Sequence, residues 1–101
     1  MATNRLRPIH PGEILREEFL APLGMSANAL ALALHVPAPR INDVVRERRA
    51  VTPDTALRLA RYFDTTPQFW LNLQTTFDLK KAASQNGEKI AAEVRPLPKA
   101  A

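Results

Sequence analysis

Proline disrupts the interior of a helix but is accepted at its first position, so its placement constrains where this chain can be helical. Three of the nine prolines, Pro11, Pro53 and Pro67, each follow a residue that can cap a helix. Each also precedes a stretch with helical spacing of apolar residues. A disordered chain would carry its prolines in clusters. The positions of these three therefore predict helix starts in a folded chain.

The spacing of apolar residues predicts five helices and no strand. They are expected over residues 11–20, 27–34, 38–46, 53–63 and from 67 onward. Pro22 and Gly24 are expected to stop the first helix, and Ser26 to cap the second. From Ser84 the apolar density falls and Gly87 interrupts the pattern. The C-terminal part is therefore expected to be a helix extension followed by a flexible tail.

Length and residue content exclude several classes of protein. A chain of 101 residues buries one small core, which excludes a large multi-domain enzyme. It has no cysteine, so disulfides and thiolate zinc sites are excluded and the cytoplasm is the expected compartment. The two histidines show no metal-binding spacing, so we expect His10 to cap a helix and His35 to lie in a turn. No enzyme activity, metal, cofactor or membrane span is expected.

The second and third expected helices form the most informative pattern. Two helices of about eight residues, joined by a tight turn containing Val36, are typical of a helix-turn-helix, whose second helix enters the major groove of DNA. At about 100° per residue, Ile41, Val44 and Val45 face the core. The opposite side carries Pro39, Arg40, Asn42, Asp43 and Arg46. Because Arg pairs with guanine, Asn with adenine and Asp with cytosine, this face is expected to read bases.

Other polar residues near this helix suit the phosphate backbone of DNA. Three cations, Arg46, Arg48 and Arg49, follow the helix, and Ser26 and Asn28 stand at the N-terminus of the preceding one. Residues 35–50 carry four Arg against one Asp and one Glu, a net charge of +2. One copy is therefore expected to bind weakly, and a dimer more tightly, with a steep dependence on salt.

Several segments together resemble one protein family. They are His10–Leu15 (HPGEIL), the helix-turn-helix, Arg48–Thr52 (RRAVT), Thr55–Ala60 (TALRLA), and above all Phe69–Gln74 (FWLNLQ) with Asp78 and Leu79. On these segments the chain resembles the HigA (VapI-like) antitoxins of bacterial toxin–antitoxin modules, within the Xre/Cro-type helix-turn-helix group. The resemblance covers about residues 8–80.

The resemblance implies an all-α, five-helix, lambda-repressor-like domain that acts as a homodimer. It further implies that the dimer binds palindromic operator DNA, represses its own operon, and neutralises a HigB-type toxin, an mRNA-cleaving ribonuclease of the RelE kind. The positions that match the family's DNA-reading residues are Ala38, Pro39, Arg40, Asn42 and Asp43. The chain departs from the family at His35 and Glu47, where Gly is usual, and at the apolar Ala38 and Pro39.

The last helix carries more large apolar residues than one side of a small core needs. These are Phe69, Trp70, Leu73 and Phe77, and they predict a homodimer interface, although Trp70 could instead complete the core of one chain. Two-fold symmetry would place the recognition helices about 34 Å apart, on half-sites about 10 base pairs between centres. The expected organisation is an arm over residues 1–8, a DNA-binding and dimerisation domain over 9–80, and the extension and tail over 81–101.

The residues leave the toxin surface and one alternative function open. Candidate toxin contacts are the first helix, with Arg16, Glu17 and Glu18, and the arm around Arg5 to Arg7. A stand-alone transcription regulator without a toxin would use the same helix-turn-helix. An interaction module that has lost DNA binding is a further alternative, because Pro39 and Glu47 are unusual in this region.

Overall fold

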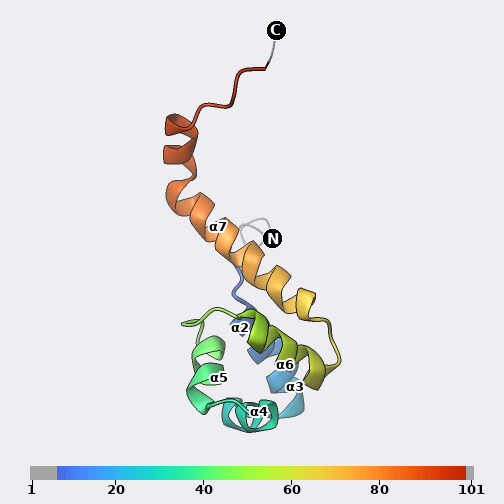
Figure 1. The fold of residues 1–101 in the computed structure, drawn as a ribbon. Helices are drawn as coiled ribbons and strands as arrows, with labels where there is room; N and C mark the ends of the chain where they lie inside the picture. Colours follow the sequence, from blue (N-terminus) through green and yellow to red (C-terminus); the bar gives the residue numbers. More distant parts are fainter. Residues whose placement is uncertain (1–6, 100–101) are drawn as a thin grey trace.

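The computed structural model describes residues 7–99, and over this range the chain is helical with no strand. The elements are α2 (Pro11–Ile14), η1 (Leu15–Leu20), α3 (Ala21–Leu23), α4 (Ala27–Leu34), α5 (Ala38–Val45), α6 (Pro53–Phe63) and α7 (Pro67–Glu93). The first three continue into one another, so they form one helical segment and the five expected helices are confirmed (Figure 1). Most of the predicted arm, residues 1–6, lies outside the described residues.

The predicted helix starts are confirmed by their caps. Pro11, Pro53 and Pro67 each occupy the first turn of a helix, where no backbone N–H is needed. Before α2, α4, α6 and α7, the side chain of the preceding residue accepts a hydrogen bond from a backbone N–H of the first turn: His10 from Gly12, Ser26 from Ala29, Thr52 from Thr55, and Thr66 from Phe69. Local sequence therefore determines where these helices begin.

The first helical segment is longer than predicted. It continues through Pro22 and ends at Gly24, which is left-handed with φ 61°. The turn before Pro22 is a π turn, in which the Ala21 N–H donates to the carbonyl of Arg16, five residues back. Proline removes one N–H from a helix and crowds the carbonyl four residues earlier. The wider π turn accommodates such a break in the ladder, so Pro22 does not stop the helix.

Helix α7 also differs from the prediction, because Gly87 does not interrupt it. The helix runs for 27 residues and its second half extends away from the other helices, which gives the molecule dimensions of 59 × 30 × 22 Å (Figure 1). Leu79, at the middle of α7, and Ile90, in its second half, are 65% and 53% exposed. Within residues 7–99, no helix is both long and apolar enough to cross a bilayer.

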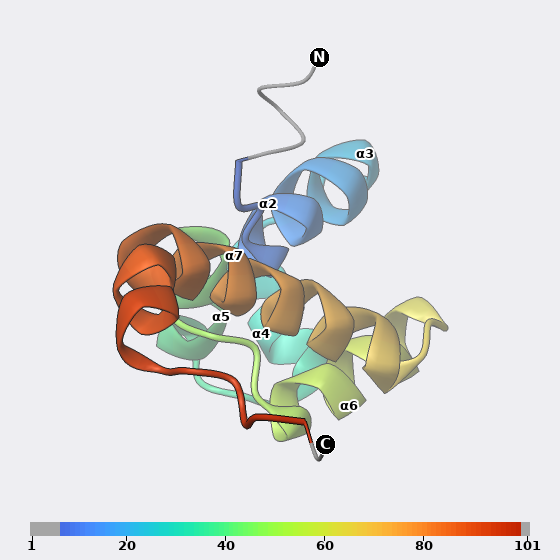
Figure 2. The ribbon, with the colours of Figure 1, turned by 90° about the horizontal axis from the view of Figure 1, so that it is seen from above.

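The core lies where the first part of α7 covers the other helices. Seen from above, α2 and α3 lie on one side of α7 and α6 lies on the other (Figure 2). The buried apolar residues come from every helical segment and, with Val51, from the loop between α5 and α6: Leu15, Leu20, Leu30, Ala31, Leu34, Ile41, Val44, Val51, Ala56, Leu59, Ala60 and Trp70.

Trp70 belongs to this core and not to an outer surface. It is fully buried within one chain, with its ring 5.0 Å from that of Phe19 and 6.4 Å from that of Phe63. Its indole N–H donates to Thr65 Oγ1 at 2.8 Å. The expectation that Trp70 forms a dimer interface is therefore wrong, and the alternative that it completes the core is correct. A fully buried side chain has no surface left to offer a second copy.

Candidate nucleic-acid interface

The turn between α4 and α5 is a tight helix end. His35 is left-handed, with φ 59°, as expected for a position where glycine is usual. The His35 N–H donates to the carbonyl of Leu32 at 3.2 Å, and the Val36 N–H donates to that of Ala31 at 3.1 Å. These two bonds form a Schellman motif. Pro37 then caps α5 in an extended conformation, so the two helices have the helix-turn-helix connection that the sequence predicts.

Helix α5 presents the predicted faces. Ile41 and Val44 are fully buried, whereas Pro39 and Arg46 are exposed. The other residues of α5 predicted to read DNA are half-buried: Ala38, Arg40, Asn42 and Asp43. Each of the polar ones has a polar contact: Arg40 with Asp54, Asn42 with Asn28, and Asp43 with Arg49. These contacts order the side chains of this face.

Asn42 is held by Asn28 of the preceding helix. Its side-chain amide donates to Asn28 Oδ1 at 2.7 Å and to the carbonyl of Ala38 at 3.0 Å. A bidentate pair with adenine needs one N–H and the oxygen of the same amide. Because both N–H groups of Asn42 are engaged, this orientation leaves only its oxygen for a base. The structure thus holds Asn42 in place but does not present it for the adenine pair that the sequence suggested.

Arg40 is paired with an acid from another helix. Its Nη1 donates to Asp54 Oδ2, in the first turn of α6, at 2.6 Å. Arg58 Nε donates to the same oxygen at 2.9 Å, and Arg58 Nη1 donates to the carbonyl of Leu34 at 2.9 Å. The hydrogen bonds from Arg58 and then Arg40 hold the pKa of Asp54 below its ordinary value.

The predicted phosphate contacts differ in their availability. Arg46 and Arg48 are exposed, and neither side chain has an ion pair with another residue of the described chain. Arg49 pairs with Asp43 at 3.3 Å. Ser26 Oγ accepts from the Ala29 N–H at 3.0 Å, which leaves its own hydroxyl proton for a phosphate oxygen. Arg46 and Arg48 are the cations that a phosphate could engage without displacing a partner.

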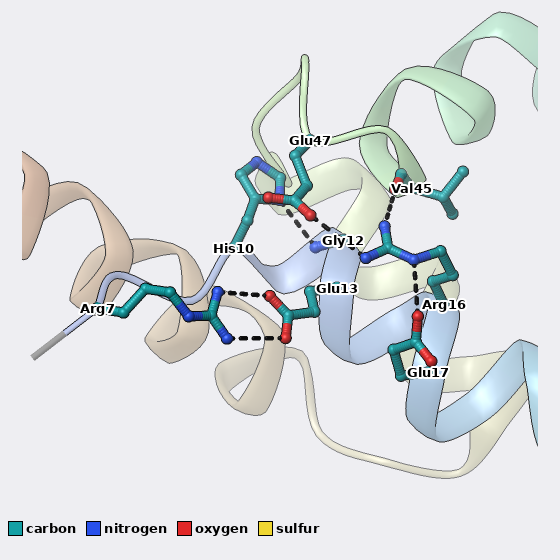
Figure 3. A network of polar contacts seen from close by, with 8 residues as sticks. All are labelled: Arg7, His10, Gly12, Glu13, Arg16, Glu17, Val45 and Glu47. Atoms are coloured by element: carbon teal, nitrogen blue, oxygen red, sulfur yellow. Dashed lines mark hydrogen bonds and ion pairs between the residues drawn. The ribbon is translucent and has the colours of Figure 1, made fainter. Parts of the chain in front are cut away.

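Arg16 holds the C-terminal end of α5 (Figure 3). Its guanidinium donates to the carbonyl of Val45, the last residue of α5, and to Glu47 Oε2 at 3.4 Å. Glu47 is left-handed, with φ 63°, at the position where the family usually has Gly. A guanidinium satisfies a free carbonyl at a helix end and opposes the negative end of the helix dipole. Arg16, which the sequence offered as a toxin contact, thus positions the recognition helix.

The start of α2 packs directly against this end of α5. An ideal Cβ built on Gly12 would lie 1.8 Å from the carbonyl oxygen of Val44. His10 is buried beside it, with its ring 4.8 Å from that of Phe77 in an edge-on arrangement. Burial lowers the pKa of His10, which favours the neutral ring whose Nδ1 accepts from the Gly12 N–H at 2.8 Å. Arg7 pairs with Glu13 at 2.9 Å and lowers the pKa of that carboxyl (Figure 3).

Gln74 anchors the loop that follows α5. Its side-chain oxygen accepts from the Val51 N–H at 2.7 Å, and its amide donates to Asp78 at 3.0 Å. Gln74 is buried, and Val51 is part of the core. The FWLNLQ segment therefore supplies Trp70 to the core and Gln74 to the loop that carries Arg48 and Arg49.

Three of the four predicted dimer residues keep some exposure in one chain. Phe69 is 38% exposed, Leu73 is half-buried, and Phe77 is half-buried against His10. Phe69 and Leu73 line a cavity of about 280 Å³ whose other walls are Ile9, Ile14, Asn72, Thr76 and Lys80. This cavity lies between the start of α2 and the first part of α7.

Sequence reasoning missed the ordering role of four residues in this region: Gly12, Arg16, Asp54 and Arg58. The Asp54 and Arg58 pair has i, i+4 spacing on one helix, which was a visible signal for an ion pair. The contacts of Arg16 with residues 29 and 31 positions away carry no such local signal.

Comparisons with known proteins agree with this geometry. A helix-turn-helix family model matches residues 15–70. Virulence-associated protein I of Dichelobacter nodosus is 63% identical over 79 residues, which are 78% of this chain and 73% of that protein. Antitoxin HigA-1 of Vibrio cholerae is 35% identical over 96% of this chain and 90% of its own. The structure of the Pseudomonas aeruginosa antitoxin HigA with the higBA promoter matches with a TM-score of 0.89 and 55% identity, over 91% of this chain and all of that one.

Proposed function

The chain belongs to the HigA family of helix-turn-helix antitoxins, a non-enzymatic family, and on this premise we propose that it binds operator DNA through α5 and represses the operon that encodes it. One observation carries the proposal. The fold matches that of an antitoxin whose structure contains its promoter, and the α4–α5 unit of this chain has the exposed face and free cations that DNA requires. A DNA partner also implies a site of action on the bacterial chromosome, in the cytoplasm.

Each residue of the interface has a proposed role. Arg46 and Arg48, with Ser26 at the start of α4, bind phosphates and set the position of the domain. Arg40 keeps free N–H groups for a guanine edge, and Pro39 offers an apolar contact such as a thymine methyl group. Residues 9–80 form the DNA-binding unit. A homodimer built on Phe69, Leu73 and Phe77 would place two such units on a palindrome.

Replacing both Arg46 and Arg48 with alanine is expected to weaken operator binding by about 10- to 100-fold at physiological salt. Each lost phosphate contact lowers the slope of log K against log salt by about 0.9, so the slope should fall by about 1.8 per protomer. Fluorescence anisotropy with a labelled promoter fragment, titrated at several salt concentrations, measures both quantities.

The matched control removes the same charge far from the interface. Lys89→Ala combined with Arg95→Ala acts on the exposed C-terminal part of the chain, and should leave the affinity and the salt slope within about twofold and 0.5 of wild type. Equal losses in the two double variants would show that only net charge matters. Unchanged binding by the Arg46 and Arg48 variant would remove α5 and its following turn from the interface.

We propose in addition that the chain neutralises a HigB-type toxin, and that the acids of η1 contribute to this contact. Glu17 and Glu18 are exposed on the first helical segment, and a basic ribonuclease would complement them. Co-expression with the product of the adjacent gene should restore growth and yield a complex. Glu17→Gln with Glu18→Gln should lower the amount that co-purifies at least several-fold, whereas Glu88→Gln with Glu93→Gln should not.

The co-expression experiment separates three results. Rescue and co-purification support the antitoxin function. Rescue without any effect of the two glutamine changes places the toxin contact elsewhere on the chain. Operator binding without rescue would identify a stand-alone transcription regulator.

A further inference from the structure

An acidic residue, Asp54, lies next to arginines at the edge of the proposed DNA-binding face. Asp54 forms an ion pair with Arg40, and the Asp54 side chain is 56% exposed. Both residues line a cavity of about 210 Å³ whose walls are Arg40, Arg49, Ala50, Thr52, Asp54 and Thr55. Two of these residues are arginines from the proposed interface. A carboxylate at this place repels phosphate, so its presence requires an explanation.

The hydrogen bonds of Asp54 connect three helices. One carboxylate oxygen accepts from Arg40 of α5 and from Arg58 of α6. Arg58 in turn donates to the carbonyl of Leu34, at the last residue of α4. The chain of contacts therefore runs from the end of α4, through Arg58 and Asp54, to the side chain of Arg40. Charge-assisted bonds of this kind restrict the orientation of a guanidinium.

The same contacts change how Arg40 can act on DNA. A free arginine pairs with any phosphate, because its charge carries no sequence information. An arginine with one nitrogen held by a carboxylate has less net charge to offer a phosphate, but keeps other N–H groups in a fixed plane. Such a side chain favours a base edge that fits its geometry.

We propose that Asp54 is a specificity-determining positioning residue, which orients Arg40 toward a base edge and prevents it from binding phosphates in general. The inference rests on the proposed DNA-binding function. It assigns Asp54 a role in discrimination between operator and other DNA. Arg58 serves as the second donor that holds Asp54 in place.

The substitution Asp54→Asn tests this role because it keeps the size of the side chain and one acceptor while removing the charge. Binding to unrelated DNA should tighten about threefold and its salt slope should rise by about 0.9, the value for one additional phosphate contact. Binding to the operator should weaken, so the ratio of the two affinities should fall about tenfold. Anisotropy titrations with the promoter fragment and a scrambled fragment measure the ratio.

Two further variants isolate the mechanism. Glu88→Gln removes an equal charge from the exposed part of α7 and should leave the affinity ratio unchanged. In an Arg40→Ala background, Asp54→Asn should no longer change the ratio, because the residue through which Asp54 acts is gone. A purely structural role for Asp54 would instead lower binding to both DNA fragments, and would persist without Arg40.

The results distinguish this inference from the proposed function. If the wild-type chain bound the two fragments equally, the proposed operator binding would be wrong. If the wild-type chain preferred the operator and Asp54→Asn kept the same ratio, or if the effect survived in the Arg40→Ala background, the role of Asp54 would be wrong while the proposed function stood.

Discussion

Replacing Gly12 with alanine is expected to lower the free energy of unfolding by about 3 kcal/mol, a large share of the 5–15 kcal/mol typical of a domain. The new Cβ would lie 1.8 Å from the carbonyl oxygen of Val44. Because that oxygen belongs to the backbone of α5, no side chain can rotate away to relieve the overlap. The start of α2 and the recognition helix must move apart. Urea unfolding followed by circular dichroism measures the loss.

Gly87 provides the matched control, since the same substitution there causes no overlap. Its nearest neighbour to an added Cβ is the Ala83 Cβ at 4.0 Å, an ordinary contact. Alanine in a helix interior is more favourable than glycine by about 0.5–1 kcal/mol, so Gly87→Ala should stabilise α7 by up to that amount. A Gly12→Ala variant that unfolded at the wild-type urea concentration would show that α2 and α5 separate without cost.

Replacing Trp70 with alanine is expected to cost about 3–5 kcal/mol. The indole is fully buried between Phe19 and Phe63 and donates a hydrogen bond to Thr65. Truncation leaves a large cavity and an unpaired hydroxyl group at Thr65 that water must satisfy. The chain should unfold at much lower temperature or urea concentration, and should do so at every protein concentration.

The neighbouring Phe69 separates core packing from dimer formation. Phe69 is 38% exposed, so Phe69→Ala should cost the single chain only about 1 kcal/mol. If Phe69 lies in a homodimer interface, the same variant should shift sedimentation at micromolar concentration toward the monomer. If the Trp70→Ala chain were folded and monomeric with an unchanged melting temperature, Trp70 would belong to the dimer interface. That result would contradict its role in the core.

The sequence predicts those features that depend on neighbouring residues. Ser26, Thr52 and Thr66 cap helices because the cap bond spans three residues or fewer. The left-handed backbone at His35 follows from its position at the end of α4, because a left-handed residue commonly ends a helix. The inward direction of Ile41 follows from helical periodicity alone.

Other features depend on contacts between distant segments and could not be predicted in this way. The pairing of Arg40 with Asp54 spans 14 residues and requires α5 and α6 to be placed first. The same holds for Gly12. Only glycine fits at this position, because α2 packs there against the backbone of α5. The persistence of the first helix through Pro22 depends on a π turn, which no apolar pattern indicates.

The projecting half of α7 has a consequence for the dynamics of the molecule. From 80 to 93 every residue is exposed except half-buried Gly87, so this part of the helix has no core to support it. An unsupported helix of this length is marginal in water and opens and closes independently of the domain. Its amide hydrogens should exchange with solvent far faster than those of the first turns of α7. Their protection factors would therefore rise as soon as a second copy or another protein covered this segment.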